Sequence, residues 1–148
     1  MTKQDFKRTT KDWILSKKFK KPDHVYLYYL EKFDIYFYWD KSNVAEIFGL
    51  YVGFQLHNGP EEVNWAVKQV EVTNKKYWKP ILMGDGSTQI FKSNFYYEDW
   101  TKEDYLEELE EVYKRYIQPY FDLGIKHVKT IAKQAWANPE AIAKVLKM

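Results

Sequence analysis

Histidine, serine and acidic side chains are the groups in this sequence that could carry out chemistry, and the histidines are the most informative. Two histidines four residues apart on a helix can bind zinc, but His24, His57 and His127 have no such spacing. A metal site assembled across the fold, for instance from His24 and His57, stays open. Histidines at strand ends are usually hydrogen-bonded surface groups, so we predict no metal site and no cofactor.

No catalytic motif surrounds the candidate nucleophiles. The chain has no cysteine, and none of its serines lies in the Gly-x-Ser-x-Gly turn of a hydrolase. Gly84-Asp-Gly-Ser87 has some features of a phosphate loop, but the strand-like residues after it predict a simple turn. A glycosidase-type pair of carboxylates stays open, although the acids cluster on a helix face where water keeps them ionised. We predict no catalytic residue and leave enzymatic activity open.

The charges are strongly segregated along the chain, although their formal sum is only +2. Residues 1–21 hold eight cations and two anions, whereas residues 98–111 hold eight anions and one cation. The acidic segment predicts a helix face that would steer a cationic partner, formed by Glu103, Glu107, Glu110 and Glu111. A solvated helix face without a partner is the simpler alternative. No nucleic-acid-binding motif accompanies the basic segment, so nucleic acid is not the expected partner.

Residues 48–57 alternate strictly between apolar side chains and small or polar ones, which predicts a β-strand with one buried face. The other face should align with the outward side of the preceding strand. Together they give the candidate binding residues Tyr36, Tyr38, Tyr51, Gln55 and His57, because tyrosine offers a rigid ring with a polar tip. Gly49 and Gly53 predict a shallow trough beside Tyr51. The alternative is that helices cover this face and the tyrosines belong to the core.

Hydrophobic spacing and turn residues predict the elements that position these side chains. They are a helix over 3–18, a hairpin with arms 25–30 and 35–39, the strand over 48–57, a turn at 84–86, a strand over 87–97, and helices over 101–117, 121–135 and 138–146. Pro60 followed by two acids predicts a further helix over 58–70, although Val63, Trp65 and Val67 also fit a strand. Pro119 should kink or interrupt the long helix.

This order of elements predicts an α+β fold. We expect one domain, residues 1–148, with an antiparallel sheet of about four strands packed by the N-terminal helix and the C-terminal helices. The N-terminus lacks a signal peptide's apolar run, and no apolar stretch approaches the roughly 20 residues that span a bilayer. The sequence therefore predicts a soluble cytoplasmic protein that does not bind a membrane. Its oligomeric state stays open.

Four short motifs follow one another along the chain in an order known from other proteins. They are Lys18-Phe-Lys-Lys21, Trp39-Asp-Lys-Ser42, Phe48-Gly-Leu-Tyr-Val-Gly-Phe54 and Tyr116-Ile-Gln-Pro-Tyr-Phe121. Their arrangement resembles the small bacterial proteins grouped as domain of unknown function 4304, whose members usually have glycine where this chain has Lys18. The resemblance covers most of the chain and implies no established catalytic residue. Some members look like candidate immunity proteins encoded beside toxins.

The leading hypothesis is a non-enzymatic cytoplasmic interaction protein whose partner is another protein. The resemblance implies that this interaction neutralises a toxin. The alternative is a small-molecule-binding domain, or an unrecognised enzyme, with a pocket lined by tyrosine and histidine on the free sheet face. A phage or mobile-element accessory protein is a third hypothesis that the sequence does not separate from the first.

Overall fold

The computed structural model describes residues 1–148 apart from 23, 44, 58–64, 136–142, 145–146 and 148. Along the chain the described elements are α1 (Lys3–Ser16), β1 (Tyr26–Tyr29), β2 (Phe33–Lys41), β3 (Phe48–Leu56), β4 (Trp65–Gln69), η1 (Lys75–Tyr77), β5 (Pro80–Leu82), β6 (Thr88–Ile90), η2 (Tyr97–Asp99), α2 (Lys102–Val112), η3 (Tyr113–Ile117), α3 (Gln118–Leu123) and α4 (Ile125–Ala135). None of the described helices is long and apolar enough to cross a membrane.

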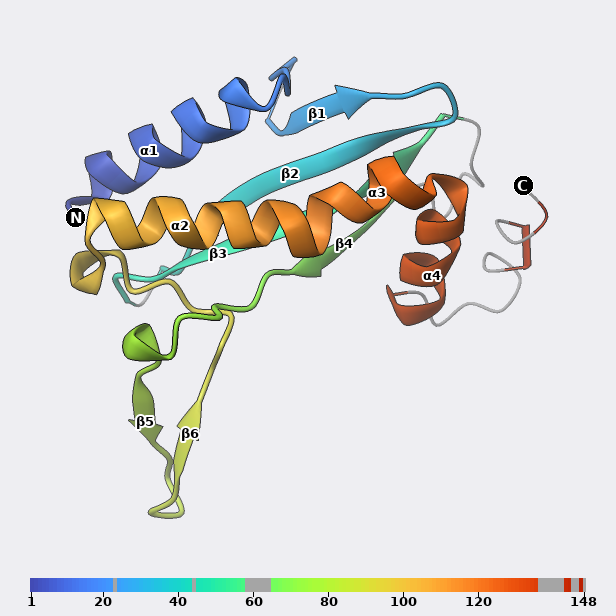
Figure 1. Cartoon of the computed structure of the whole chain (residues 1–148). Coiled ribbons are helices and arrows are strands. Elements are labelled where there is room, and N and C mark those ends of the chain that lie inside the picture. Colours follow the sequence, from blue (N-terminus) through green and yellow to red (C-terminus); the bar gives the residue numbers. More distant parts are fainter. Residues whose placement is uncertain (23, 44, 58–64, 136–142, 145–146, 148) are drawn as a thin grey trace.

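Strands β1 to β4 form one antiparallel sheet in chain order, and the helices pack on one of its faces (Figure 1). Alternation places the side chains of Ile35 and Phe37 in β2, and of Leu50 and Val52 in β3, on the helix side. The predicted α+β class, the single domain, the hairpin and the strand over 48–57 are confirmed.

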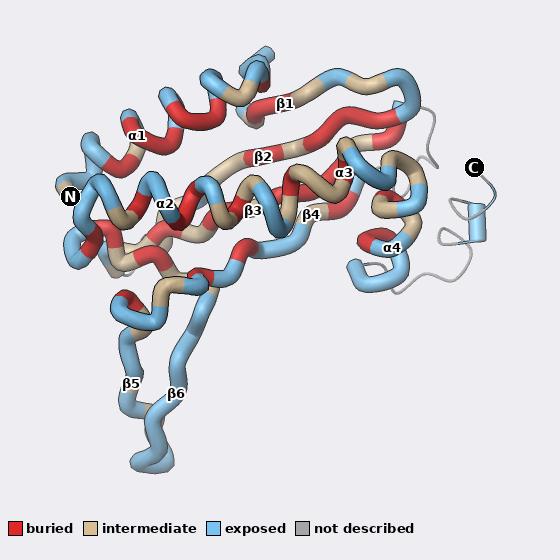
Figure 2. The backbone as a smooth tube through the Cα atoms, in the orientation of Figure 1, coloured by how far each residue is buried: buried red, intermediate tan, exposed pale blue. Residues whose placement is uncertain are grey.

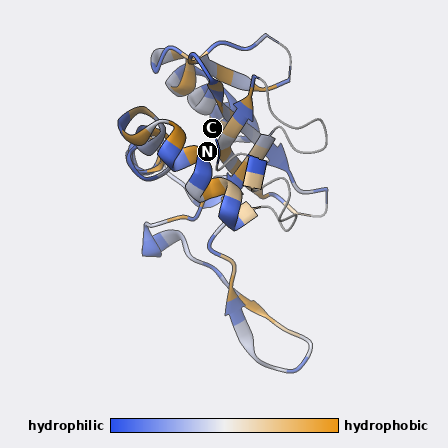
Figure 3. Cartoon of the chain, turned by 90° about the vertical axis from the view of Figure 1, so that its right-hand side faces the viewer, coloured by the Kyte–Doolittle hydropathy of each residue, from blue (hydrophilic) through white to orange (hydrophobic). Residues whose placement is uncertain are grey.

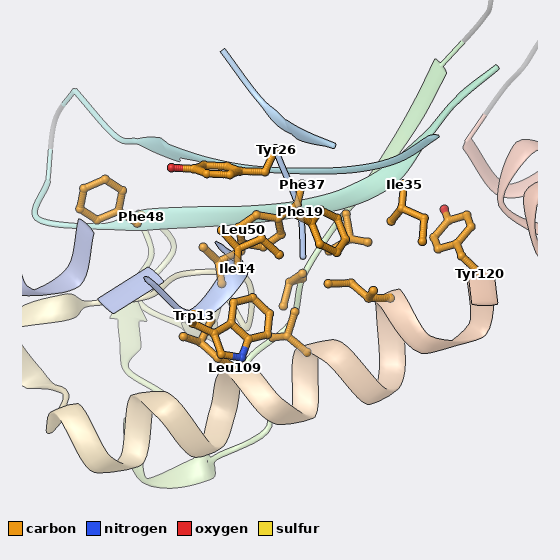
Figure 4. Close-up of a cluster of buried hydrophobic side chains, with 14 of the residues drawn as sticks. Trp13, Ile14, Phe19, Tyr26, Ile35, Phe37, Phe48, Leu50, Leu109 and Tyr120 are labelled. Carbon is orange, nitrogen blue, oxygen red and sulfur yellow. The ribbon is translucent and has the colours of Figure 1, made fainter. Parts of the chain in front are cut away.

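A single hydrophobic cluster lies between the sheet and the helices (Figures 2 and 4). Phe6 of α1 stacks on Phe48 of β3 at 4.4 Å between ring centroids and on Tyr105 of α2 at 4.8 Å. One side chain therefore joins three elements that are far apart in sequence. Burying a ring of this size contributes about 1.5–3 kcal/mol, so such contacts dominate the stability of the fold.

Helix α1 begins and ends at recognisable residues. The hydroxyl of Thr2 accepts the Asp5 backbone N–H at 3.1 Å, and the Asp5 carboxylate accepts the Thr2 N–H at 3.0 Å, which completes a capping box. Just after the helix, Lys18 has a φ of +72°. This left-handed conformation is strained for any residue with a Cβ and is the one that glycine adopts most easily after a helix.

The helix predicted over 58–70 is wrong where the structure describes it, because residues 65–69 form strand β4. Ala66 lies opposite Phe54 and Val67 opposite Gly53 in the β3–β4 ladder. Ala66 and Val70 are buried on the helix side, whereas Trp65 points to the other side. The strand alternative is therefore correct for this segment, while the predicted helix start at 58–62 lies outside the described residues.

Strands β5 and β6 form a separate hairpin that projects from the body of the molecule (Figures 1 and 3). The turn at 84–86 is confirmed, but the strand predicted over 87–97 extends only from Thr88 to Ile90. Phe91 is exposed on the hairpin, while Phe95 is buried and pairs with Phe48 through backbone hydrogen bonds. The two phenylalanines thus do not share one side, because the chain bends between them to rejoin the sheet.

The long C-terminal helix continues through Pro119 by changing its hydrogen-bond pattern. Helix α2 passes into a π-helical segment, η3, in which the N–H of Gln118 donates to the carbonyl of Tyr113, and α3 follows. The wider π turn accommodates a proline that cannot donate a backbone hydrogen bond. Gly124, with a φ of +57°, then ends α3 before α4. Of the terminal helix predicted over 138–146, residues 138–142 and 145–146 lie outside the described residues.

Candidate binding surface

A row of aromatic rings crosses the sheet on the face opposite the helices. Tyr38 and Tyr51 are register partners in β2 and β3, and their rings stack at 4.7 Å with an 8° angle between planes. Tyr36 meets Tyr38 edge-on at 5.7 Å and lies nearly parallel to Trp65 of β4 at 6.3 Å. We call Tyr36, Tyr38, Tyr51 and Trp65 the aromatic row. The structure thus brings together the three tyrosines predicted from the sequence, and Trp65 joins them because residues 65–69 form a strand.

No described helix covers the aromatic row (Figure 1). Its tyrosines are partly exposed, and Trp65 is 52% exposed. The covered-face alternative is therefore wrong for the part of the chain that the structure describes. Partial burial raises the pKa of the Tyr36 and Tyr38 phenols. At neutral pH both phenols keep their protons and can donate hydrogen bonds to a partner.

His57 lies just beyond β3 on the same face and is fixed by two hydrogen bonds. Its Nε2 donates to the Asp34 carboxylate at 2.7 Å, and its Nδ1 lies 2.9 Å from the carbonyl oxygen of Glu31. The hydrogen bond to Asp34 raises the pKa of His57, because it stabilises the protonated ring. Gln55, the register partner of Asp34, lies between His57 and the aromatic row. With both ring nitrogens engaged, His57 is a poor metal ligand or proton-transfer group.

Besides Trp65, Asp34 is a residue on this face that the sequence reasoning missed. Its side chain is only 6% exposed although it lies on the outward side of β2. Asp34 is the register partner of Gln55, two residues before His57. Placing Asp34 beside His57 required this β2–β3 register, which the sequence pattern alone did not supply.

The trough predicted at Gly49 and Gly53 is filled. A Cβ added at Gly53 would lie 1.8 Å from the carbonyl oxygen of Ala66, so the absent side chain makes room for the backbone of β4. A Cβ added at Gly49 would lie 2.8 Å from the side-chain nitrogen of Gln69 and 3.2 Å from Tyr51. The glycines therefore allow close strand and side-chain packing, and the surface around Tyr51 has no hollow at these positions.

The acidic residues of α2 lie on the other side of the sheet from the aromatic row (Figure 1). Glu110 is held by α1, since its carboxylate accepts the indole N–H of Trp13 at 3.0 Å and lies 2.9 Å from the Lys17 ammonium. Glu111 lies 3.8 Å from the ammonium of Lys114. Glu103 and Glu107 are exposed and make no ion pair with other described residues. The four glutamates and the tyrosines thus cannot contact one partner as a continuous surface.

Other charged side chains of the helical segment 101–117 also contact distant parts of the chain. The Thr101 hydroxyl caps the Asp104 N–H at 3.2 Å, while the Asp104 carboxylate accepts the Tyr77 hydroxyl and does not complete a capping box. The Tyr77 hydrogen bond lowers the pKa of Asp104. Arg115 donates to the backbone carbonyl of Glu71 at 2.6 Å. Asp104 and Arg115 thus bind groups far from them in sequence.

Comparison with known proteins supplies no relative from which a function could be transferred. No family model, curated protein or solved structure matches the chain. The likeness to domain of unknown function 4304 therefore rests on its short motifs, and the function has to follow from the side chains of this protein.

Glu108 has a structural role that the sequence reasoning also missed. It is 2% exposed, and its carboxylate accepts the backbone N–H of Thr73, the Thr73 hydroxyl and the N–H of Asn74 at 2.7–3.2 Å. These bonds attach α2 to the segment that follows β4. Helical spacing gave a signal, because Glu108 borders the apolar stripe that contains Tyr105 and Val112.

The described residues contain no group of three or more side chains placed to hold a metal ion. His24 lines a hollow of about 140 Å³ with Lys21, Tyr26, Tyr38 and Trp39. His57 does not line this hollow, so the structure does not bring the two histidines together as a site. What remains on the outward face is a row of aromatic rings with the amide of Gln55 and the imidazole of His57 at one end.

Proposed function

We propose that this protein is a non-enzymatic binding protein and that its partner is another protein, bound on the aromatic row. The observation that carries the proposal is the row itself, four rings on a sheet face that no described helix covers. Tyrosine and tryptophan supply large, rigid contact areas with polar tips, which is why they dominate the binding energy of many protein interfaces.

The filled space at the two glycines favours a protein over a small molecule. Small-molecule sites are concave and surround most of their ligand, whereas Gln69 and the β4 backbone fill the space above the two glycines here. The imidazole of His57 is also engaged by Asp34 and the Glu31 carbonyl. A row of partly exposed rings is better suited to a partner protein, whose interface has aromatic side chains at its core.

The resemblance to domain of unknown function 4304 implies which kind of protein the partner is, a toxin encoded beside this chain. The backbone at Lys18 supports the resemblance independently, because its φ of +72° is the conformation that favours the glycine usual in that family. The acidic face of α2 would then act at a distance. Its field would speed the approach of a cationic toxin without forming the contact, since it lies on the other side of the sheet.

The test is to co-express this chain with the protein encoded next to it and to measure the affinity of the purified pair. Trp65→Ala removes the most exposed ring of the row, and an aromatic anchor that the partner buries is worth about 2 kcal/mol or more, which corresponds to about 30-fold in Kd. Leu123→Ala is the matched control, because Leu123 is similarly exposed at 54% but lies at the end of α3.

We expect Trp65→Ala to weaken binding about 30-fold and Leu123→Ala to change it by less than about twofold. Equal effects of the two substitutions would mean that the partner does not dock on the row. A photo-crosslinking residue at Gln69, beside Tyr51, should capture the same partner, whereas one at Lys133 on α4 should not. Absence of any complex with the neighbouring gene product would refute the toxin-neutralising form of the proposal.

A further inference from the structure

A second surface, on the helix side of the sheet, has a different chemistry. A groove of about 440 Å³ runs between α1 and the β1–β2 hairpin. Lys7, Arg8 and Lys11 line it from α1, where their spacing places them on one stripe of the helix. Lys21 lines it from the segment before β1, and Asp12 is the one acid among its lining residues. The groove thus concentrates four cations against one anion.

These four cations form no ion pair within the described part of the chain, although Arg8 interacts electrostatically with the Asp5 carboxylate. Some lysines elsewhere pair with acids, namely Lys17 with Glu110, Lys76 with Asp104, Lys79 with Asp99 and Lys114 with Glu111, whereas others, such as Lys126 and Lys133, pair with no described acid. No ion pair joins Lys7, Arg8, Lys11 or Lys21 to a described acid. Four cations gathered in one groove beside a single lining acid repel one another, and an anionic ligand would relieve this repulsion.

Aromatic rings form the wall of the groove opposite α1. Trp39 stacks on Tyr26 at 5.4 Å between ring centroids, with 20° between their planes, and the Lys21 ammonium lies 5.4 Å from the Tyr26 centroid. Tyr26 is buried, whereas Trp39 remains partly exposed. The groove continues past these rings into the smaller hollow that also contains His24 and Tyr38. Cations along a concave path with an accessible indole recognise both phosphates and bases.

We infer that this groove binds single-stranded nucleic acid, with Lys7, Arg8, Lys11 and Lys21 contacting phosphates and Trp39 stacking on a base. A concave path beside a ring suits a flexible single strand, whose bases are free to stack, better than a duplex. An acidic peptide would satisfy the cations but would make no use of the exposed part of the Trp39 ring. A membrane surface would favour a flat basic face over a groove. The proposed contacts are distinct from those of the aromatic row, because Trp39 and Tyr38 point to opposite faces of β2 and Tyr38 borders only the adjoining hollow.

The experiment measures binding of a fluorescein-labelled oligothymidylate of about 12 nucleotides by anisotropy as the salt concentration is raised. With four phosphate contacts, log K should fall with log[salt] with a slope of about −2.8, so affinity drops about 50-fold between about 50 and 200 mM salt. Lys7→Gln combined with Lys11→Gln removes two contacts. It should halve the slope and weaken binding about 25-fold at about 100 mM salt.

Lys126→Gln combined with Lys133→Gln is the matched control, because it removes the same charge from exposed positions on α4. It should change affinity by less than about twofold if contacts in the groove, and not net charge, carry binding. Base stacking has its own readout, since the oligonucleotide should quench tryptophan fluorescence in the wild type and in Trp65→Phe, but not in Trp39→Phe.

Three results would overturn the inference. The first is an absence of binding at about 50 mM salt, where phosphate contacts are strongest. The second is an equal loss of affinity in the groove variant and the α4 control, which would leave only a net-charge effect. The third is tighter binding to a duplex of the same length or to phosphatidylserine vesicles, which would assign the cations to another class of partner. None of these outcomes depends on the aromatic row, so this test and that of the partner protein are independent.

Discussion

Replacing Glu108 with alanine should destabilise the fold by about 2–3 kcal/mol, whereas the same replacement at Glu107, its neighbour on α2, should have almost no effect. Both substitutions remove one carboxylate from the same helix and introduce the same residue, so their charge and helix-propensity effects match. They differ in burial, because Glu108 is 2% exposed and Glu107 faces solvent. The difference in stability therefore isolates what the buried carboxylate does.

The magnitude follows from the three donors that Glu108 satisfies in Thr73 and Asn74. A hydrogen bond to a charged group contributes about 1.5–3 kcal/mol net, but the three do not add, because Thr73 is exposed and water can replace part of the loss. For a chain of this length, about 2–3 kcal/mol corresponds to a fall of about 6–10 °C in Tm. Glu108→Gln should lie between wild type and alanine, because its carbonyl oxygen still accepts while its amide group faces the donors.

Urea denaturation followed by tryptophan fluorescence, together with calorimetry, would measure these differences. The denaturation midpoint should fall for Glu108→Ala with an unchanged m-value, since the exposed surface on unfolding stays the same. If the two alanine variants differ by less than about 0.5 kcal/mol, the hydrogen bonds of Glu108 contribute nothing net and our reasoning about this residue is wrong.

Two further substitutions test the local features described above. Lys18→Gly should raise stability by about 0.5–1 kcal/mol in the same assay, because relief of the left-handed conformation outweighs the entropy that glycine loses; a loss of stability would contradict this. For His57, the folded-state pKa is raised by Asp34, so its stabilisation is complete below the unfolded pKa and is lost as pH rises through the folded value. The stability gap between wild type and His57→Gln should therefore be largest near about pH 5.5 and shrink by about pH 9, and a gap that grows with pH would refute the assignment.

The elements that could be predicted from the sequence are those whose burial pattern is local. Alternation over residues 48–57 requires one buried face, and β3 has it, with Leu50 and Phe54 fully buried. Residues 65–69 were predicted less well, because Pro60 and the acids after it give a helix-start signal. These residues form a strand because they pair with β3, where the backbone of β4 approaches Gly53 closely. That contact is non-local, and a sequence pattern does not contain it.

The candidate surface likewise combines features that the sequence predicts with features that depend on non-local contacts. The three tyrosines could be placed on one face from their spacing alone, because strands alternate regularly. The hydrogen bond between Asp34 and His57, and the capture of Glu110 by Trp13 and Lys17 of α1, each depend on how separate elements approach one another. The charges in the sequence thus predicted an acidic helix, but they did not predict which of its carboxylates bind other side chains of the protein.

The projecting hairpin of β5 and β6 offers a site at which a label can be attached to the molecule. A side chain added at Gly84, in the turn at its tip, would meet no other atom within 4 Å. The hairpin also points away from α1 and its groove (Figure 1). A cysteine introduced at Gly84 would be the chain's sole thiol, so a dye or a biotin could be coupled there selectively and the protein tethered to a sensor in one orientation.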